Sequence, residues 1–170
     1  LPLAGLALYV CFAPFDPPEG KGELPGTVVL DSHGTVLQRD SSRGLRIPVH
    51  LDQMAPLLLQ ATISAEDPRF EDHFGIDPLA VGRAVLPQGT HPSGASTITQ
   101  QLARTLYLQD AGGPALLRKG REALIALQLE AHYSKDEILE LYLNRVYYGR
   151  EAYGVEAAAR SYFGTNARNL

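Results

Sequence analysis

The chain has 170 residues, of which 45% are hydrophobic and 20% are charged, and its formal net charge is −4. A chain of this length forms one domain, or two small ones, and is long enough to bury a substantial core. The acidic balance argues against nucleic-acid binding, because phosphate contacts need clustered lysines and arginines. The single cysteine, Cys11, excludes an internal disulfide framework and a thiolate metal cluster.

The first 13 residues, LPLAGLALYVCFA, contain no charged side chain. A membrane-spanning helix needs about 20 apolar residues, so this run is too short to cross a bilayer by itself. Three interpretations are open at this point: the outer end of a membrane anchor, a buried helix, and a processed signal peptide.

Residues 14–26 contain four prolines and three glycines, a density that is typical of a linker. The next segment predicts a β-hairpin, with strands at residues 27–30 and 35–37 on either side of a glycine-containing turn. From residue 51 onward the pattern is helical to the end, apart from a Pro- and Gly-rich stretch at residues 87–95. The predicted fold class is therefore mainly α, with a short N-terminal β-hairpin.

Three of the predicted helices have recognisable ends. Asp77 is a typical N-cap, and Pro78 then occupies the first helical position. The sequence SKDE at residues 134–137 is a capping box, which opens a helix that we expect to run to Tyr148. The third helix covers residues 96–106 and carries the most informative pattern.

Two stripes of side chains run along this third helix. Residues spaced four apart form an apolar stripe, namely Ile98, Leu102 and Leu106. A second stripe, about 200° away around the axis, is polar and consists of Ser96, Gln100 and Arg104. A hydroxyl, an amide and a guanidinium on one face suit the oxygens of a sugar or a phosphate. A solvated amphipathic helix capped by Ser96 explains the same pattern.

Glu66, Phe70 and His73 are spaced so that they would share one helical face. Pro68 would fit the first turn of a helix that begins near Glu66, or would kink a longer one. Glu66 follows an apolar stretch, so we expect its carboxylate to be partly desolvated, as suits a general acid or base. An exposed acidic turn is the alternative.

Arg118, Lys119 and Glu122 lie on one side of a further predicted helix, and Arg121 is adjacent. Two nearby cations would keep Glu122 ionised and make it a poor proton donor. Glu122 could then orient the cations, stabilise developing positive charge or hold a divalent metal, and the cations would suit a pyrophosphate. A surface salt-bridge network, which is worth little energetically, is the alternative.

Five segments match, in order, the motifs of one family: residues 66–77, 94–101, 118–122, 134–149 and 152–164. Together they resemble the peptidoglycan glycosyltransferase (transglycosylase) family, the membrane-proximal domains of class A penicillin-binding proteins and their monofunctional relatives. The upstream linker and hairpin are similar to the pedestal that follows the membrane anchor in this family. The segment Ser42-Arg43-Gly44 is similar to the subtype called penicillin-binding protein 1C.

The resemblance implies a lysozyme-like, two-lobed helical fold and polymerisation of lipid II into glycan strands, with release of undecaprenyl pyrophosphate. Glu66 would be the general base for the acceptor's 4-hydroxyl, and Glu122, the second catalytic carboxylate, would organise the cations. The residues expected to bind substrate are Asp67, Phe70, His73, Ser96, Thr97, Gln100, Gln101, Arg104, Arg118, Lys119 and Arg121. Mg2+ or Mn2+ could assist at the pyrophosphate, whereas no organic cofactor is expected.

The implied organisation has three parts: a trimmed anchor end at 1–13, a linker and hairpin pedestal at 14–60, and a glycosyltransferase domain at 61–170. This domain is expected to be truncated at its C-terminus, where relatives often continue into a transpeptidase domain. The expected location is the outer face of the bacterial plasma membrane, and the expected partners are the membrane, lipid II, the growing glycan strand and other cell-wall synthesis proteins. The alternatives are a lysozyme-like glycan hydrolase or lytic transglycosylase, and a non-catalytic module that binds lipid II.

Overall fold

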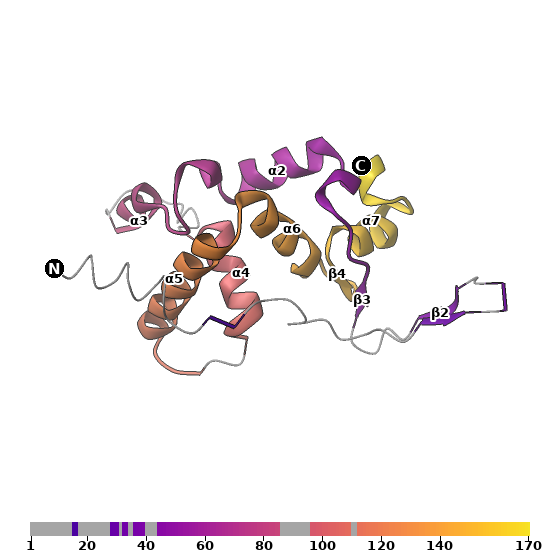
Figure 1. The fold of residues 1–170 in the computed structure, drawn as a ribbon, viewed down its shortest axis with the longest axis horizontal. Helices are drawn as coiled ribbons and strands as arrows, with labels where there is room; N and C mark the ends of the chain where they lie inside the picture. Colours follow the sequence, from indigo (N-terminus) through magenta and orange to yellow (C-terminus); the bar gives the residue numbers. More distant parts are fainter. Residues whose placement is uncertain are drawn as a thin grey trace.

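The structure, a computed structural model, describes residues 15–16, 28–30, 32–33, 36–39, 44–85, 96–109 and 112–170. It is mainly helical, as predicted (Figure 1). The apolar run at residues 1–13 lies outside the described residues. Among the helices that are described, none is both long enough and apolar enough to cross a membrane.

The described part of the chain forms α-helices, 3-10 turns and short strands, labelled here as in Figure 1. The α-helices are α2 (Pro56–Glu66), α3 (Pro78–Val85), α4 (Ile98–Tyr107), α5 (Ala115–His132), α6 (Lys135–Arg145) and α7 (Val155–Phe163). The 3-10 turns cover Leu51–Gln53, Phe70–Asp72 and Ala167–Asn169. The strands are β1 (Val28–Leu30), β2 (Val36–Arg39), β3 (Leu45–Arg46) and β4 (Ala152–Tyr153).

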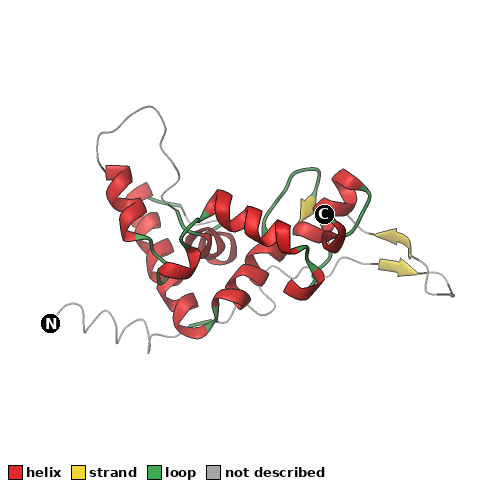
Figure 2. Ribbon diagram, turned by 90° about the horizontal axis from the view of Figure 1, so that it is seen from above, coloured by secondary structure: helices red, strands yellow, loops and turns green. Residues whose placement is uncertain are grey.

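The predicted hairpin is confirmed. Strands β1 and β2 pair antiparallel, with Val28 opposite Arg39 and a register shift between Val29 and Leu30. The hairpin projects away from the helices (Figures 1 and 2). A second, parallel pair joins β3 to β4. That pair was not predicted, because its two strands are very short and come from opposite ends of the domain. Strands of this length show no recognisable alternation of polar and apolar residues in the sequence.

Helix α4 packs against α5 and α6 and forms the centre of the core. Ile98 and Leu102 of the predicted apolar stripe are fully buried, and Leu106 packs against the same core. The helix begins with a capping box in which Thr97 Oγ1 accepts a hydrogen bond from the backbone N–H of Gln100. The cap is therefore Thr97, and the expectation that Ser96 caps the helix is wrong.

The side chain of Gln100 does not lie on a solvent-facing polar stripe. Gln100 Oε1 folds back to accept a hydrogen bond from the backbone N–H of Thr97, and the residue is only 3% exposed. The predicted face of Ser96, Gln100 and Arg104 is thus divided between the protein interior and the surface. The backbone N–H groups at the start of a helix have no acceptor within the helix. The Gln100 side chain turns inward because it supplies such an acceptor.

Helix α6 begins at the predicted capping box, where Ser134 Oγ accepts from the backbone N–H of Glu137. It ends at Arg145, so the expected continuation to Tyr148 is wrong. The backbone beyond the helix turns back on itself, and Tyr148 N–H donates to the Ala152 carbonyl. This reversal uses hydrogen bonds across the turn in place of helical ones.

Two glycines let backbone segments approach closely around the helices. Gly75 has φ +75°, and a Cβ there would lie 2.9 Å from the Ala126 carbonyl oxygen of α5. Gly154 has φ +84°, and a Cβ there would lie 2.7 Å from the Asn144 carbonyl oxygen of α6. Both positions need the left-handed backbone that glycine adopts without steric cost. Gly75 thereby places the loop after Glu66 directly against α5.

Candidate active site

Glu66 is the last residue of α2, and the chain leaves the helix at Asp67. Pro68 explains this end, because a proline disfavours helical backbone at the residue before it. The expectation that Glu66, Phe70 and His73 share one helical face is therefore wrong, since Phe70 lies in a separate 3-10 turn and His73 follows it. Glu66 is also exposed, so the expected partial desolvation of its carboxylate is not observed.

Asp67 and His73 fasten the loop after Glu66 to the beginning of α4. Asp67 is 5% exposed, and its Oδ2 accepts a hydrogen bond of 3.1 Å from the backbone N–H of Ile98. The same carboxylate lies 3.0 Å from His73 Nε2, and both side chains are 4% exposed. A buried carboxylate at a helix N-terminus satisfies a backbone donor and complements the helix dipole. These contacts set the position of Glu66 relative to α4.

The carboxylate of Glu66 is held by Gln101, a residue of α4. Gln101 Nε2 donates a hydrogen bond of 2.9 Å to Glu66 Oε2. Gln101 Oε1 accepts one of 3.1 Å from the hydroxyl of Tyr142, which belongs to α6. Three helices thus meet at this amide, and the structure brings together the predicted residues Glu66 and Gln101.

Phe70, Thr97 and Gln100 make contacts with the protein interior. Phe70 is completely buried, and Lys135 Nζ lies 4.4 Å from the centre of its ring. Thr97 Oγ1 donates a hydrogen bond of 2.7 Å to the Gly75 carbonyl. The predicted roles of these residues in substrate binding stay predictions, and their observed contacts support the loop after Glu66.

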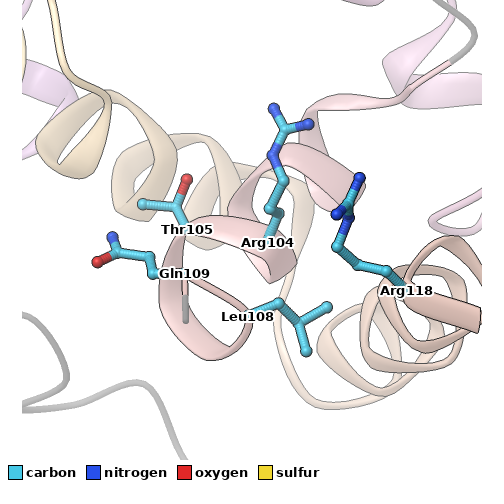
Figure 3. A pocket seen from close by; sticks show the side chains of 5 residues that line it. All are labelled: Arg104, Thr105, Leu108, Gln109 and Arg118. Carbon is cyan, nitrogen blue, oxygen red and sulfur yellow. The ribbon is translucent and has the colours of Figure 1, made fainter. Parts of the chain in front are cut away.

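A pocket of about 330 Å³ lies where α4 and the beginning of α5 meet. It is lined by Arg104, Thr105, Leu108, Gln109 and Arg118. Figure 3 shows the guanidinium groups of Arg104 and Arg118 extending on the same side of the pocket. Because its lining, as far as the chain is described, includes two guanidinium groups and no carboxylate, the pocket suits an anion.

The predicted contact between Lys119 and Glu122 is confirmed. Lys119 Nζ donates hydrogen bonds of 2.9 Å to Glu122 Oε2 and 2.7 Å to Ser96 Oγ. Glu122 is 3% exposed, whereas Arg118 and Arg121 are exposed. Glu122 therefore orients Lys119 toward the beginning of α4, and the two arginines remain accessible to a ligand.

Two tyrosines near Glu66 were missed by the sequence analysis. Burial raises the pKa of the Tyr142 phenol above its ordinary range, and the charge of Glu66 adds to this shift. Burial, followed by the charge of Glu66, raises the pKa of Tyr148 to about 12. Both phenols are therefore protonated at neutral pH, and that of Tyr142 donates a hydrogen bond to Gln101. Tyr142 follows the buried Ile138 by one helical turn. A tyrosine hydroxyl on the buried face of a helix was therefore the pattern in the sequence that could have indicated this residue.

The raised pKa of Tyr148 predicts a loss of stability at alkaline pH. The folded state favours the protonated phenol, so this contribution is complete below the unfolded-state pKa of about 10 and is lost as the pH rises toward about 12. We expect the free energy of unfolding to fall by about 2 kcal/mol more in the wild type than in Tyr148→Phe between pH of about 9 and 11.5. Urea unfolding measures this difference. Equal losses in both proteins would contradict it, and the exposed Tyr147→Phe serves as control.

The acidic residues of the site do not fit a metal held by the protein alone. Within the described residues, no three His, Cys, Asp or Glu side chains come together in a metal-binding group. Glu122 already has Lys119 as its counter-ion. The expected Mg2+ or Mn2+ stays a prediction, and no step of the reaction is assigned to it.

Most of this chain matches a known protein family. Residues 33–170 match the family model described as Transglycosylase, and the chain belongs to this family. This membership confirms the family and the class of enzyme predicted from the motifs.

Similar proteins include penicillin-binding protein 1A of Escherichia coli (strain K12), which is 49% identical over 128 residues, or 74% of this chain. Penicillin-binding protein 1A of Vibrio cholerae is 47% identical over 128 residues, also 74% of the chain. Penicillin-binding protein 2D of Bacillus subtilis (strain 168) is 45% identical over 147 residues, or 85% of the chain. The chain spans 15% of the length of each of the first two proteins and 21% of the third. The 1C subtype stays a prediction, because none of these three relatives carries that name.

Proposed function

We propose that this domain polymerises lipid II into glycan strands, with Glu66 as the general base and a lipid pyrophosphate as the leaving group. One observation carries the proposal: helix α4 holds the exposed carboxylate of Glu66 through Gln101, and three residues further along the same helix Arg104 lines a pocket together with Arg118. A base and an anion site are the two elements that this transfer reaction needs.

In the proposed reaction, the acceptor's 4-hydroxyl oxygen bonds to the anomeric carbon of the donor sugar. The bond from that carbon to the pyrophosphate oxygen breaks, and the hydroxyl proton passes to Glu66. Gln101 donates a hydrogen bond to Glu66 Oε2, and the proposal assigns Oε1 to the uptake of the proton. Assistance by a positioned base of this kind is worth about 10²–10⁴ in rate.

The leaving pyrophosphate already carries negative charge, so it needs electrostatic stabilisation more than a proton. Arg104 and Arg118 supply that charge from the pocket, and Lys119, held by Glu122, adds a third cation nearby. Glu122 is nearly completely buried and is paired, so it acts by orienting Lys119. In this proposal Glu66 is the base, and Glu122 positions a cation.

The proposal also covers the location of the domain, the rest of the complete protein, and its ligands and partners. The similarity to penicillin-binding proteins supports a membrane anchor at the N-terminal apolar run, a domain on the outer face of the membrane, and a transpeptidase domain in the complete protein. Lipid II and the growing glycan strand would be its ligands, and other cell-wall synthesis proteins would be its partners.

A hydrolase or lytic transglycosylase acting on finished glycan needs a protonated acid and no phosphate site, so the arginine pocket argues against it. The two proposals differ in what they release. A transferase releases lipid pyrophosphate from lipid II as linkages form, which a phosphate-release assay coupled to a pyrophosphatase measures. Release of new reducing ends from finished glycan, without lipid pyrophosphate from lipid II, would contradict the proposal. Retention of intact lipid II would indicate a binding module.

Removing one arginine of the pocket is expected to weaken binding of the lipid pyrophosphate. A charge-assisted hydrogen bond contributes about 1.5–3 kcal/mol, so Arg118→Ala should raise the Kd for lipid II about 10- to 100-fold. Arg121→Ala, outside the pocket lining, should have a smaller effect, and the exposed Arg168→Ala is the matched control. Binding is measured by the fluorescence of labelled lipid II. Equal effects of all three substitutions would show that the pocket is not the pyrophosphate site.

A further inference from the structure

A chain of hydrogen bonds connects the buried hydroxyl of Tyr142 to the carboxylate of Glu66 through a single side chain, Gln101. We propose that Tyr142 is a positioning residue of the reaction: it fixes the side-chain amide of Gln101, and Gln101 in turn fixes the carboxylate of Glu66. This inference rests on the proposed function, because it concerns the group that acts as base.

The chemistry of the three groups allows one direction of hydrogen bonding along this chain. An ionised carboxylate accepts hydrogen bonds only, so the NH2 of Gln101 must face Glu66. The amide carbonyl then faces Tyr142, which donates its phenolic proton at 3.1 Å. Because burial keeps this phenol protonated well beyond neutral pH, the donor is present whenever the enzyme works. The reversed amide would place its carbonyl against the carboxylate and is disfavoured.

Glu66 needs such support because of where it lies. It is exposed at the C-terminal end of α2, and a glutamate side chain there has several rotamers of similar energy. Gln101 is only partly buried, so its amide would also rotate without a second partner. Tyr142, in contrast, is 4% exposed and belongs to the core. The fixed point of the chain is therefore the tyrosine.

The helix that carries Tyr142 is itself firmly attached. Asn144, two residues further on α6, accepts a hydrogen bond of 2.9 Å from the Val49 N–H. Its side-chain amide donates one of 2.8 Å to the Val49 carbonyl. These bonds join the end of α6 to the segment that leads into α2. Tyr142 thus transfers the rigidity of the core to the carboxylate at the surface.

The test compares Tyr142→Phe with the wild-type chain in a lipid II polymerisation assay. Loss of one neutral hydrogen bond should lower kcat about 5- to 10-fold, with KM and the thermal midpoint nearly unchanged. Tyr107→Phe is the matched control, because its hydroxyl donates to a distant backbone carbonyl, that of Asp16; it should leave kcat unchanged. An unchanged kcat in Tyr142→Phe, or a parallel loss in thermal stability that accounts for the effect, would overturn the inference.

A double variant tests whether Tyr142 acts through Gln101. In a Gln101→Met background, which has no amide to position, Tyr142→Phe should cause no further loss of kcat. A further loss as large as in the wild-type background would show that Tyr142 acts by another route and would overturn the inference. The side-chain amide resonances of Gln101, assigned with Gln101→Met, should also shift in Tyr142→Phe. Unchanged resonances overturn the hydrogen-bond chain whatever the activity, whereas absence of polymer from the wild type overturns the proposed function.

Discussion

Glu66→Gln is expected to lower the rate of lipid II polymerisation by about 10²–10⁴-fold while leaving lipid II binding nearly unchanged. The substitution retains the size of the side chain and an oxygen that accepts a hydrogen bond, but removes its ability to take up the hydroxyl proton. Glu66 is exposed and contributes no side chain to the core, so the fold should persist. The cations that hold the pyrophosphate lie on α4 and α5 and are not altered.

The assay follows conversion of lipid II by the variant at the same concentration as the wild type, and binding is measured separately with labelled lipid II. Glu71→Gln is the matched control, since Glu71 is an exposed acid in the following 3-10 turn. Chain growth by Glu66→Gln at a rate close to that of Glu71→Gln would remove Glu66 from the role of base.

Glu130→Ala is expected to lower the free energy of unfolding by about 3–5 kcal/mol, the cost of breaking a buried ion pair from one side. Glu130 Oε1 accepts hydrogen bonds of 2.7 Å from both Thr99 Oγ1 and Lys135 Nζ. The carboxylate is 3% exposed and Lys135 is 20% exposed, so the ammonium would lose its counter-ion in a largely buried position. Lys135 also donates a hydrogen bond to the His73 carbonyl, so the loss of Glu130 should also destabilise the loop after Glu66.

Urea unfolding with circular dichroism measures this effect, and Glu71→Ala, an exposed glutamate, should change stability by no more than about 0.5 kcal/mol. Combining Glu130→Leu with Lys135→Met should recover much of the lost stability, because neither charge then remains buried without a partner. A loss below about 1 kcal/mol for Glu130→Ala would show that this ion pair contributes little to the fold.

Features that depend on neighbouring residues were predicted well. The capping box at Ser134 and the buried positions of Ile98 and Leu102 follow from local hydrogen bonding and from helical periodicity. Asp77 also caps α3, since its Oδ1 accepts from the backbone N–H groups of Leu79 and Ala80. The ion pair of Lys119 with Glu122 has the i, i+3 spacing of one helix face. In each case the spacing alone brings the groups together.

Features that depend on tertiary contacts were not predicted, and one local feature was left open. Pro68 was expected to lie in the first turn of a helix that begins near Glu66 or to kink a longer one, whereas α2 ends at Glu66, two residues before the proline. Gln100 has the spacing of a surface residue, but its side chain turns inward to the backbone of Thr97. The contact of Tyr142 with Gln101 joins two helices whose packing is decided by the whole core. Motif resemblance therefore identified the glutamates, and only the fold shows what holds them.

The central claim, that Glu66 and the arginine pocket together form a transferase site, is tested most directly by the products of the wild-type chain. Lipid II and purified finished glycan are supplied in parallel, and the products are separated by length on a gel. We expect a ladder of lengthening glycan strands from lipid II and no change in the finished glycan. Shortening of the finished glycan, with no ladder from lipid II, would contradict the claim.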